Sequence, residues 1–207
     1  MKIVATLSLL LCFSGAAQTQ TAPVHDKEYL ISLLESTLRD FTAAAGKATE
    51  AQWNFKPAPD KWSLAEVAEH LMLSEIQMYF EVLMAFNAPA HPELRAQTAG
   101  NDSKAIDFIL EDGKHVANRM MVPLGYRGSK ESLLQALKDR RQMSIDLARA
   151  KSEEELRTHM VYKDKANKTP IRDAYQDLLV FALHITRHMR QVDSIQSDPN
   201  YPRASSR

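Results

Sequence analysis

Two histidines one helical turn apart, His184 and His188, lie in a long stretch with helical periodicity near the end of the chain. A third, His70, lies in an earlier stretch of the same kind. Side chains four residues apart stack on one face of an α-helix, so both imidazoles of the pair can reach one cation. If the two helices face each other, His70 completes three nitrogen ligands and leaves a fourth position open, as in catalytic zinc sites. A water bound there would be a nucleophile near neutral pH.

Polar residues near these histidines are candidates for outer-shell roles. Gln191 lies one turn after His188 and could orient a ligand or a water, although a surface amide is an equal alternative. Asp177 lies two turns before His184, about 10 Å along the helix axis, which favours an outer-shell or solvent-facing carboxylate. Ile185 stands where a zinc protease carries its general base, which disfavours that class. Spacing alone leaves a further alternative, because histidine pairs also occur on surfaces and in hydrogen-bonded cores.

The elements that must position these residues are helical. The apolar periodicity predicts four long helices, and no alternating pattern predicts a strand of useful length. Capping residues or a first-turn proline mark the predicted starts. These starts are Asp26, Ser63, Ser129 and Thr169–Pro170, with ends near Ala45, Phe86, Ala150 and Asp198. Weaker helical pieces are expected within 103–121 and from Ser152. The fold class predicted is all-α, an up-down-type four-helix bundle with long connecting loops.

The beginning of the chain is typical of a secretory signal peptide. Lys2 precedes an apolar run from Ile3 to Phe13, and small residues ending at Ala17 offer a cleavage site. A lipoprotein anchor at Cys12 is the alternative; otherwise this only cysteine leaves with the signal, so the mature protein has no disulfide. We expect a signal peptide at 1–17, a flexible leader at 18–25, a helical domain at 26–202 and a tail at 203–207. The expected location is periplasmic or secreted.

Composition excludes some partners. The chain has 207 residues, with 26 basic and 26 acidic side chains, so it is formally neutral. Nucleic-acid binding needs a basic surface, and neutrality argues against it. The signal segment is too short to span a bilayer, and no membrane span is expected after its removal. The sequence therefore predicts an exported helical domain without a nucleic-acid partner or a membrane span.

Two segments resemble a known family. The run from Trp53 to Leu71 is similar to the beginning of the second helix of DinB-like proteins, and His184–Val192 followed by Pro199–Pro202 resembles their last helix. The resemblance spans about residues 26–202. It implies a four-helix bundle, a divalent metal ion (zinc or nickel) bound by His70, His184 and His188, and a homodimer. Members of this family include bacillithiol transferases, mycothiol-dependent isomerases and proteins described as metal-dependent hydrolases.

The resemblance implies a metal-dependent hydrolase or a thiol S-transferase that acts on a small molecule. Export would separate the chain from cytosolic thiols, which weakens the transferase hypothesis. No residue of this chain can be matched to a general base of the family. Two alternatives stay open: a non-catalytic bundle that binds a metal or ligand, and an interaction module whose histidines are structural.

Overall fold

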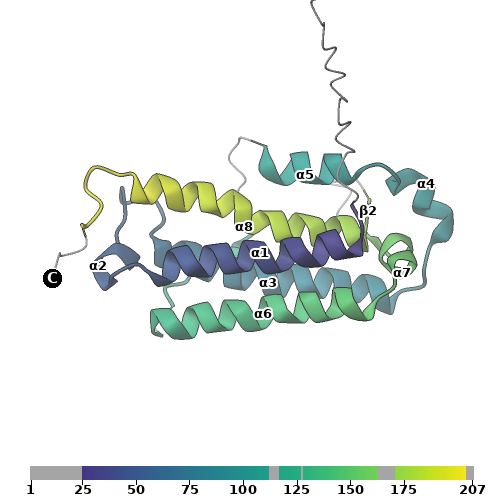
Figure 1. Cartoon of the computed structure of the whole chain (residues 1–207), viewed down its shortest axis with the longest axis horizontal. Helices are drawn as coiled ribbons and strands as arrows, with labels where there is room; N and C mark the ends of the chain where they lie inside the picture. The colour runs from purple at the N-terminus through teal and green to yellow at the C-terminus, as the bar shows by residue number, and fades with distance from the viewer. Residues whose placement is uncertain (1–24, 112–116, 127, 163–170, 204–207) are drawn as a thin grey trace, which may run out of the picture.

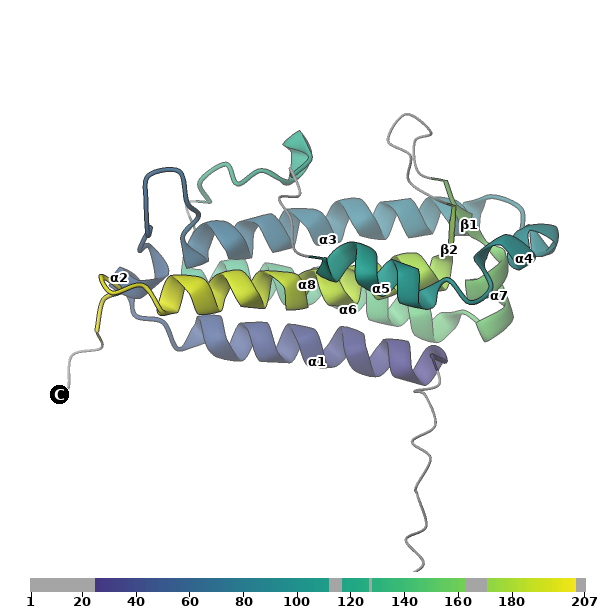
Figure 2. The ribbon, with the colours of Figure 1, turned by 90° about the horizontal axis from the view of Figure 1, so that it is seen from above.

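Four long helices lie side by side and form the body of the protein (Figures 1 and 2). The computed structural model describes residues 25–111, 117–126, 128–162 and 171–203, so the predicted signal peptide and all but one residue of the predicted leader lie outside the described residues. The long helices are α1 (Lys27–Gly46), α3 (Leu64–Asn87), α6 (Lys130–Ala150) and α8 (Ala174–Gln196). Each of α1 and α3 packs against both α6 and α8. The predicted all-α four-helix bundle is confirmed.

The directions of the helices are not a plain alternation. The ammonium of Lys130, at the start of α6, donates to the carbonyl of Ala48, just after α1, so these helices are antiparallel. Tyr175, at the start of α8, donates to the carbonyl of Asp26, so α1 and α8 are parallel. Helices α3 and α6 are also parallel, because residues at the starts of both helices, Ser63 and Ser129, line one pocket. Helices α1 and α3 are thus antiparallel, as are α6 and α8, which follows the up-down pattern. The exception is α6, which follows α3 in the chain and runs parallel to it.

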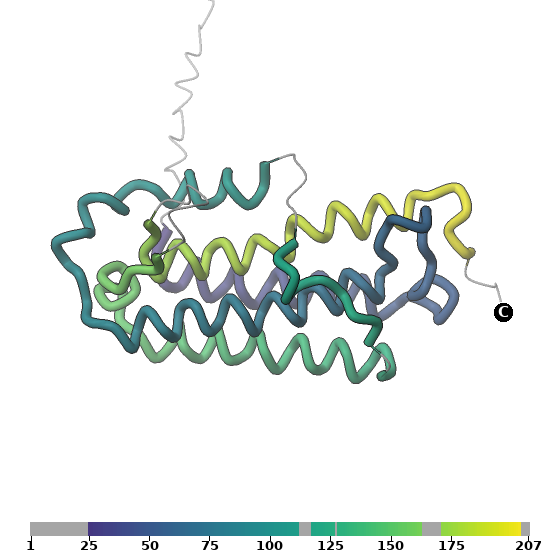
Figure 3. Tube along the Cα trace, turned by 180° about the vertical axis from the view of Figure 1, so that it is seen from behind, coloured from purple at the N-terminus to yellow at the C-terminus, as the bar shows by residue number. Residues whose placement is uncertain are grey.

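A parallel neighbour needs a connection that returns along the whole bundle. Residues 88–129 make this connection, and the described parts of it, 88–111 and 117–126, are visible from behind in Figure 3. Its short helices are η1 (Pro92–Leu94), α4 (Arg95–Thr98), α5 (Asp102–Leu110) and η2 (Arg119–Met121). The broken helix predicted within 103–121 corresponds to α5 and η2. The other connections contain α2 (Glu50–Trp53), α7 (Glu153–Thr158), β1 (Met160–Val161) and β2 (Arg172–Asp173).

Most helix starts are where the capping residues predict them. The side chains of Asp26, Ser63, Ser129 and Ser152 each accept a hydrogen bond from the first helical turn. The predicted start of the last helix was too early, and Thr169 and Pro170 lie outside the described residues. Helix α8 begins after Asp173, whose carboxylate accepts a hydrogen bond from the backbone N–H of Gln176. In return, the side-chain Oε1 of Gln176 accepts from the backbone N–H of Asp173. Before it, β2 pairs antiparallel with β1, and this pairing holds the chain extended up to the cap.

One guanidinium joins the four long helices inside the core. Arg141 on α6 is fully buried and forms a two-pronged ion pair with Glu75 on α3. Its remaining N–H groups donate to the carbonyl of Leu34 on α1, at 3.4 Å, and to that of Phe181 on α8, at 3.0 Å. Apolar clusters fill the bundle on either side of this pair. Among the helices of the described residues, none has an apolar run long enough to cross a membrane.

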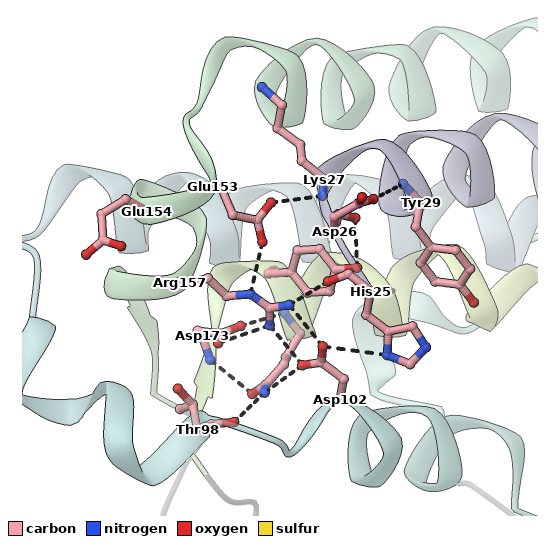
Figure 4. A network of polar contacts seen from close by, with 12 residues as sticks. His25, Asp26, Lys27, Tyr29, Thr98, Asp102, Glu153, Glu154, Arg157 and Asp173 are labelled. Carbon is pink, nitrogen blue, oxygen red and sulfur yellow. Dashed lines mark hydrogen bonds and ion pairs between the residues drawn. The ribbon is translucent and has the colours of Figure 1, made fainter. Parts of the chain in front are cut away.

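A second arginine, Arg157, connects the residues before α1 to neighbouring helices (Figure 4). Arg157 on α7 donates to both carboxylate oxygens of Asp102, at 2.8 and 2.9 Å, and to the carbonyl of His25 at 3.0 Å. Its guanidinium lies 3.6 Å from the ring centre of Tyr175. The Arg157 network therefore fixes α1, α5, α7 and α8 at one end of the bundle.

Candidate metal centre

The three histidines singled out by sequence meet in one buried cluster. His70 comes from the second turn of α3, and His184 and His188 come from one face of α8. Nε2 of His184 lies 3.3 Å from Nε2 of His70 and 3.1 Å from Nε2 of His188. All three side chains are almost completely buried. Their potential ligand atoms all lie within 4.8 Å of one another. Within the described part of the chain, these three histidines are the group of side chains that could bind a metal ion.

The spacing of these nitrogens suits a small divalent cation. Ligands bound tetrahedrally at about 2.0–2.1 Å from a zinc ion lie about 3.3–3.4 Å apart. The two shortest nitrogen separations in the cluster, 3.1 and 3.3 Å, are close to that value. Three lone pairs pointed at one another would repel without a positive charge between them. The geometry therefore fits a cation held by three imidazoles.

Hydrogen bonds on the far side of two rings direct their lone pairs inward. Nδ1–H of His70 donates to the carbonyl of Met121, at 2.7 Å, and Nδ1–H of His188 donates to Oε1 of Gln191, at 2.9 Å. With Nδ1 protonated, Nε2 of a neutral imidazole is free to bind a metal. Gln191 therefore lies where the outer-shell prediction puts it. Nδ1 of His184 is buried and has no hydrogen-bond partner among the described residues.

Burial keeps the cluster in the neutral form that a metal requires. It lowers the pKa of His70, lowers that of His188 to about 3, and holds that of His184 well below its ordinary value. In His184 and His188, repulsion from neighbouring positive charge acts in the same direction. At neutral pH the imidazoles are therefore uncharged, and no positive charge within the cluster opposes the binding of a cation.

Two further side chains enclose the cluster. The indole of Trp62, in the loop before α3, lies 4.9 Å from the ring centre of His70 and stacks at 6.4 Å on His188. The hydroxyl of Ser74, one turn after His70, lies 3.5 Å from its Nε2 and donates to its carbonyl. Trp62 shields the imidazoles from bulk water, and Ser74 adds a polar group beside them.

Glu69 holds the segment that supplies the Met121 carbonyl. Its buried carboxylate accepts hydrogen bonds from the consecutive backbone N–H groups of Leu124, Gly125 and Tyr126, at 2.9, 3.1 and 2.9 Å. Gly125 has a φ of 83°, a left-handed conformation that glycine adopts without strain. Sequence reasoning missed this clamp. The available signal was a carboxylate next to His70 on a largely buried helix, because a buried charge needs partners.

Asp177, predicted as an outer-shell or solvent-facing carboxylate, lies away from the histidine cluster and is buried. It is buried in the first turn of α8, and its carboxylate lies 3.4 Å from the guanidinium of Arg172. Its place is about 10 Å along the helix from His184. Its charge therefore belongs to the base of α8 rather than to the imidazole cluster.

The comparisons with known proteins agree with this fold. The profile of the DinB superfamily matches residues 33–192, which include the three histidines. The chain belongs to the DinB superfamily. Among solved structures, YfiT from Bacillus subtilis is similar, at 14% sequence identity and a TM-score of 0.59 over 88% of this chain and 93% of that one. YfiT is described as a probable metal-dependent hydrolase with an unusual four-helix bundle topology. No curated protein sequence matches the chain significantly. The resemblance to DinB-like proteins drawn from sequence is confirmed.

Proposed function

We propose that this DinB superfamily member is a metal-dependent hydrolase that binds one divalent ion, zinc or nickel, through His70, His184 and His188. The observation that carries the proposal is the convergence of three Nε2 atoms, two of them with lone pairs directed inward by hydrogen bonds on the opposite ring nitrogen. The description of the structurally similar YfiT as a probable metal-dependent hydrolase supports it.

An ion held by three protein ligands keeps a position for water or substrate, and it lowers the pKa of that water toward neutrality. The residues of this chain would supply the surroundings of the reaction. His70 and His188 are held in place by Met121 and Gln191, which fixes the direction of their lone pairs. Trp62 excludes bulk water, and the Ser74 hydroxyl offers a hydrogen bond to a bound small molecule.

Hydrolysis suits the remaining expectations better than thiol transfer. A hydrolase needs only water as its second substrate. The signal peptide predicted from sequence leads us to propose that the mature protein acts outside the cytoplasm, away from the pool of small thiols. We therefore propose a small exported hydrolase with an organic ester or amide as its substrate class.

Metal analysis of tag-free mature protein tests the proposal. We expect about one zinc or nickel ion per chain, in line with a single three-ligand site, and loss of that ion in His188→Ala. His91→Ala is the matched control, because His91 is paired with Glu93 away from the cluster and should leave metal content unchanged. Hydrolysis of nitrophenyl esters and anilides, with and without added thiol, should stop after chelation and return with metal. A metal-free protein, or one whose hydrolysis survives His188→Ala, would overturn the proposal.

A further inference from the structure

An apolar groove of about 760 Å³ runs along the outer side of α3 between η2 and β1. Its walls carry large apolar side chains that are unusually exposed for their type. The exposed fractions are 54% for Phe80, 64% for Met84 and 74% for Met120. A contiguous apolar surface of this kind, with concave shape, is typical of a site for an apolar ligand.

The groove lies along the face of α3 that carries His70. On an α-helix, residues seven apart lie on nearly the same face, two turns or about 10 Å along the axis. Gln77 and Met84, which line the groove, are seven and fourteen residues after His70 and share its face of α3. At the other wall, Met120 directly precedes Met121, whose carbonyl holds the His70 ring. The groove and the cluster therefore share one helix face and one loop.

The side chains that line the groove indicate which kind of ligand it binds. Among the described residues that line the groove, Glu81 is the one with a charged side chain, and it accepts a hydrogen bond from Gln77. The other amide atom of Gln77, Oε1, is buried and has no hydrogen-bond partner among the described residues. The groove thus offers a long apolar surface with one acceptor near its inner end. A neutral aliphatic tail fits this pattern, and an N–H of an amide substrate can donate to Oε1 of Gln77.

We propose that this groove binds the apolar tail of the substrate, so that the enzyme acts on acyl esters or amides with a medium-length aliphatic chain. The proposal rests on the hydrolase function proposed above, because the histidine cluster must hold the reacting head group. Phe80 and Met84 determine specificity for the tail and take no part in the chemistry.

Calorimetric titration of zinc-loaded, tag-free protein with straight-chain alkyl hydroxamic acids, from acetohydroxamic to octanohydroxamic acid, tests the inference. The hydroxamate head binds the metal, and each homologue differs only in its tail. We expect the affinity to rise about two- to fourfold for each methylene group that the groove buries. In Phe80→Ser and Met84→Ser the gain in affinity per methylene group should nearly disappear, while the affinity for acetohydroxamic acid stays unchanged. Met143→Ser, which changes an exposed methionine on α6, is the matched control and should keep the full gain.

The outcomes separate the two proposals. Zinc-dependent binding of acetohydroxamic acid with no gain from longer tails would overturn the groove and leave the hydrolase proposal standing. If acetohydroxamic acid does not bind at all, the hydrolase proposal fails, and titration with 1-octanol tests the groove alone. Octanol binding that Phe80→Ser abolishes supports the groove, and absent binding overturns it. A dimer that Phe80→Ser converts to a monomer would assign this face to a second copy of the chain and also overturn the inference.

Discussion

Removal of the Glu69 carboxylate tests whether the loop around Met121 is needed for the metal site. Glu69 accepts hydrogen bonds from three consecutive N–H groups, and its neighbour His70 donates to the carbonyl of Met121 in the same segment. The two side chains thus attach one segment to α3 at two points. In Glu69→Ala, the segment loses these three hydrogen bonds and keeps the histidine contact.

The expected magnitude follows from these contacts. Hydrogen bonds to a charged group contribute about 1.5–3 kcal/mol each. Water can replace part of this contribution because the segment is at the surface, where Leu124 is 84% exposed. We therefore expect the apo-protein to lose about 2–4 kcal/mol of unfolding free energy, less than the sum of three such bonds. Loss of an outer-shell partner of a ligating histidine weakens metal binding about 10–100-fold. Since Glu69 acts on His70 through Met121, we expect a decrease near the lower limit, about tenfold.

Two measurements on Glu69→Ala separate the effects. Urea unfolding of the apo-protein gives the stability change, and competition with a chromophoric chelator gives the metal affinity. Glu66→Ala is the control: it removes the same charge from the same helix, and Glu66 caps α3 and pairs with Lys56. Glu66→Ala should lose about 0.5–2 kcal/mol, as expected for a helix cap, with unchanged metal affinity. Unaltered metal affinity in Glu69→Ala, despite reduced stability, would refute the reasoning.

Three further predictions concern the core, the domain start and the indole beside the site. Glu75→Leu alone should cost about 3–5 kcal/mol in urea unfolding because it leaves a buried charge without a partner, whereas adding Arg141→Met should recover most of this loss; equal stability of the single and double variants would contradict it. Arg157→Ala should lower the unfolding free energy by about 2–4 kcal/mol through loss of charged hydrogen bonds, with metal affinity unchanged, as chelator competition would report. Nickel should quench the fluorescence of Trp62 because its ring lies 4.9 Å from that of His70; Trp62→Phe should abolish most of the quenching, and quenching that persists there would point to Trp53.

Local signals in the sequence predicted most of the helices and part of the histidine cluster. Asp26 and Ser63 mark helix starts because a cap acts within three residues of itself. His184 and His188 could be paired from spacing, because four residues on a helix fix their relative position. His70 needed the family resemblance as well, because its distance from the pair depends on how α3 packs against α8.

Features that depend on distant segments could not be read in this way. The parallel arrangement of α3 and α6 depends on the path of 88–129, which no local pattern specifies. The partners of Glu69 are backbone N–H groups more than fifty residues away, and a backbone group carries no sequence signal. The start of α8 was misplaced because the capping pair Asp173 and Gln176 went unrecognised, and because the pairing of β1 with β2 involves residues brought together only by folding.

The guanidinium of Arg141 has a consequence for how this domain assembles. Its acceptors come from three other helices, so a hairpin or a three-helix intermediate would leave some of its N–H groups dehydrated and unmatched. Partial docking of the helices is therefore unfavourable, and Arg141 gains all of these acceptors only when the fourth helix packs against the other three. This makes unfolding more nearly all-or-none. It also disfavours any helix order that separates the arginine from Glu75.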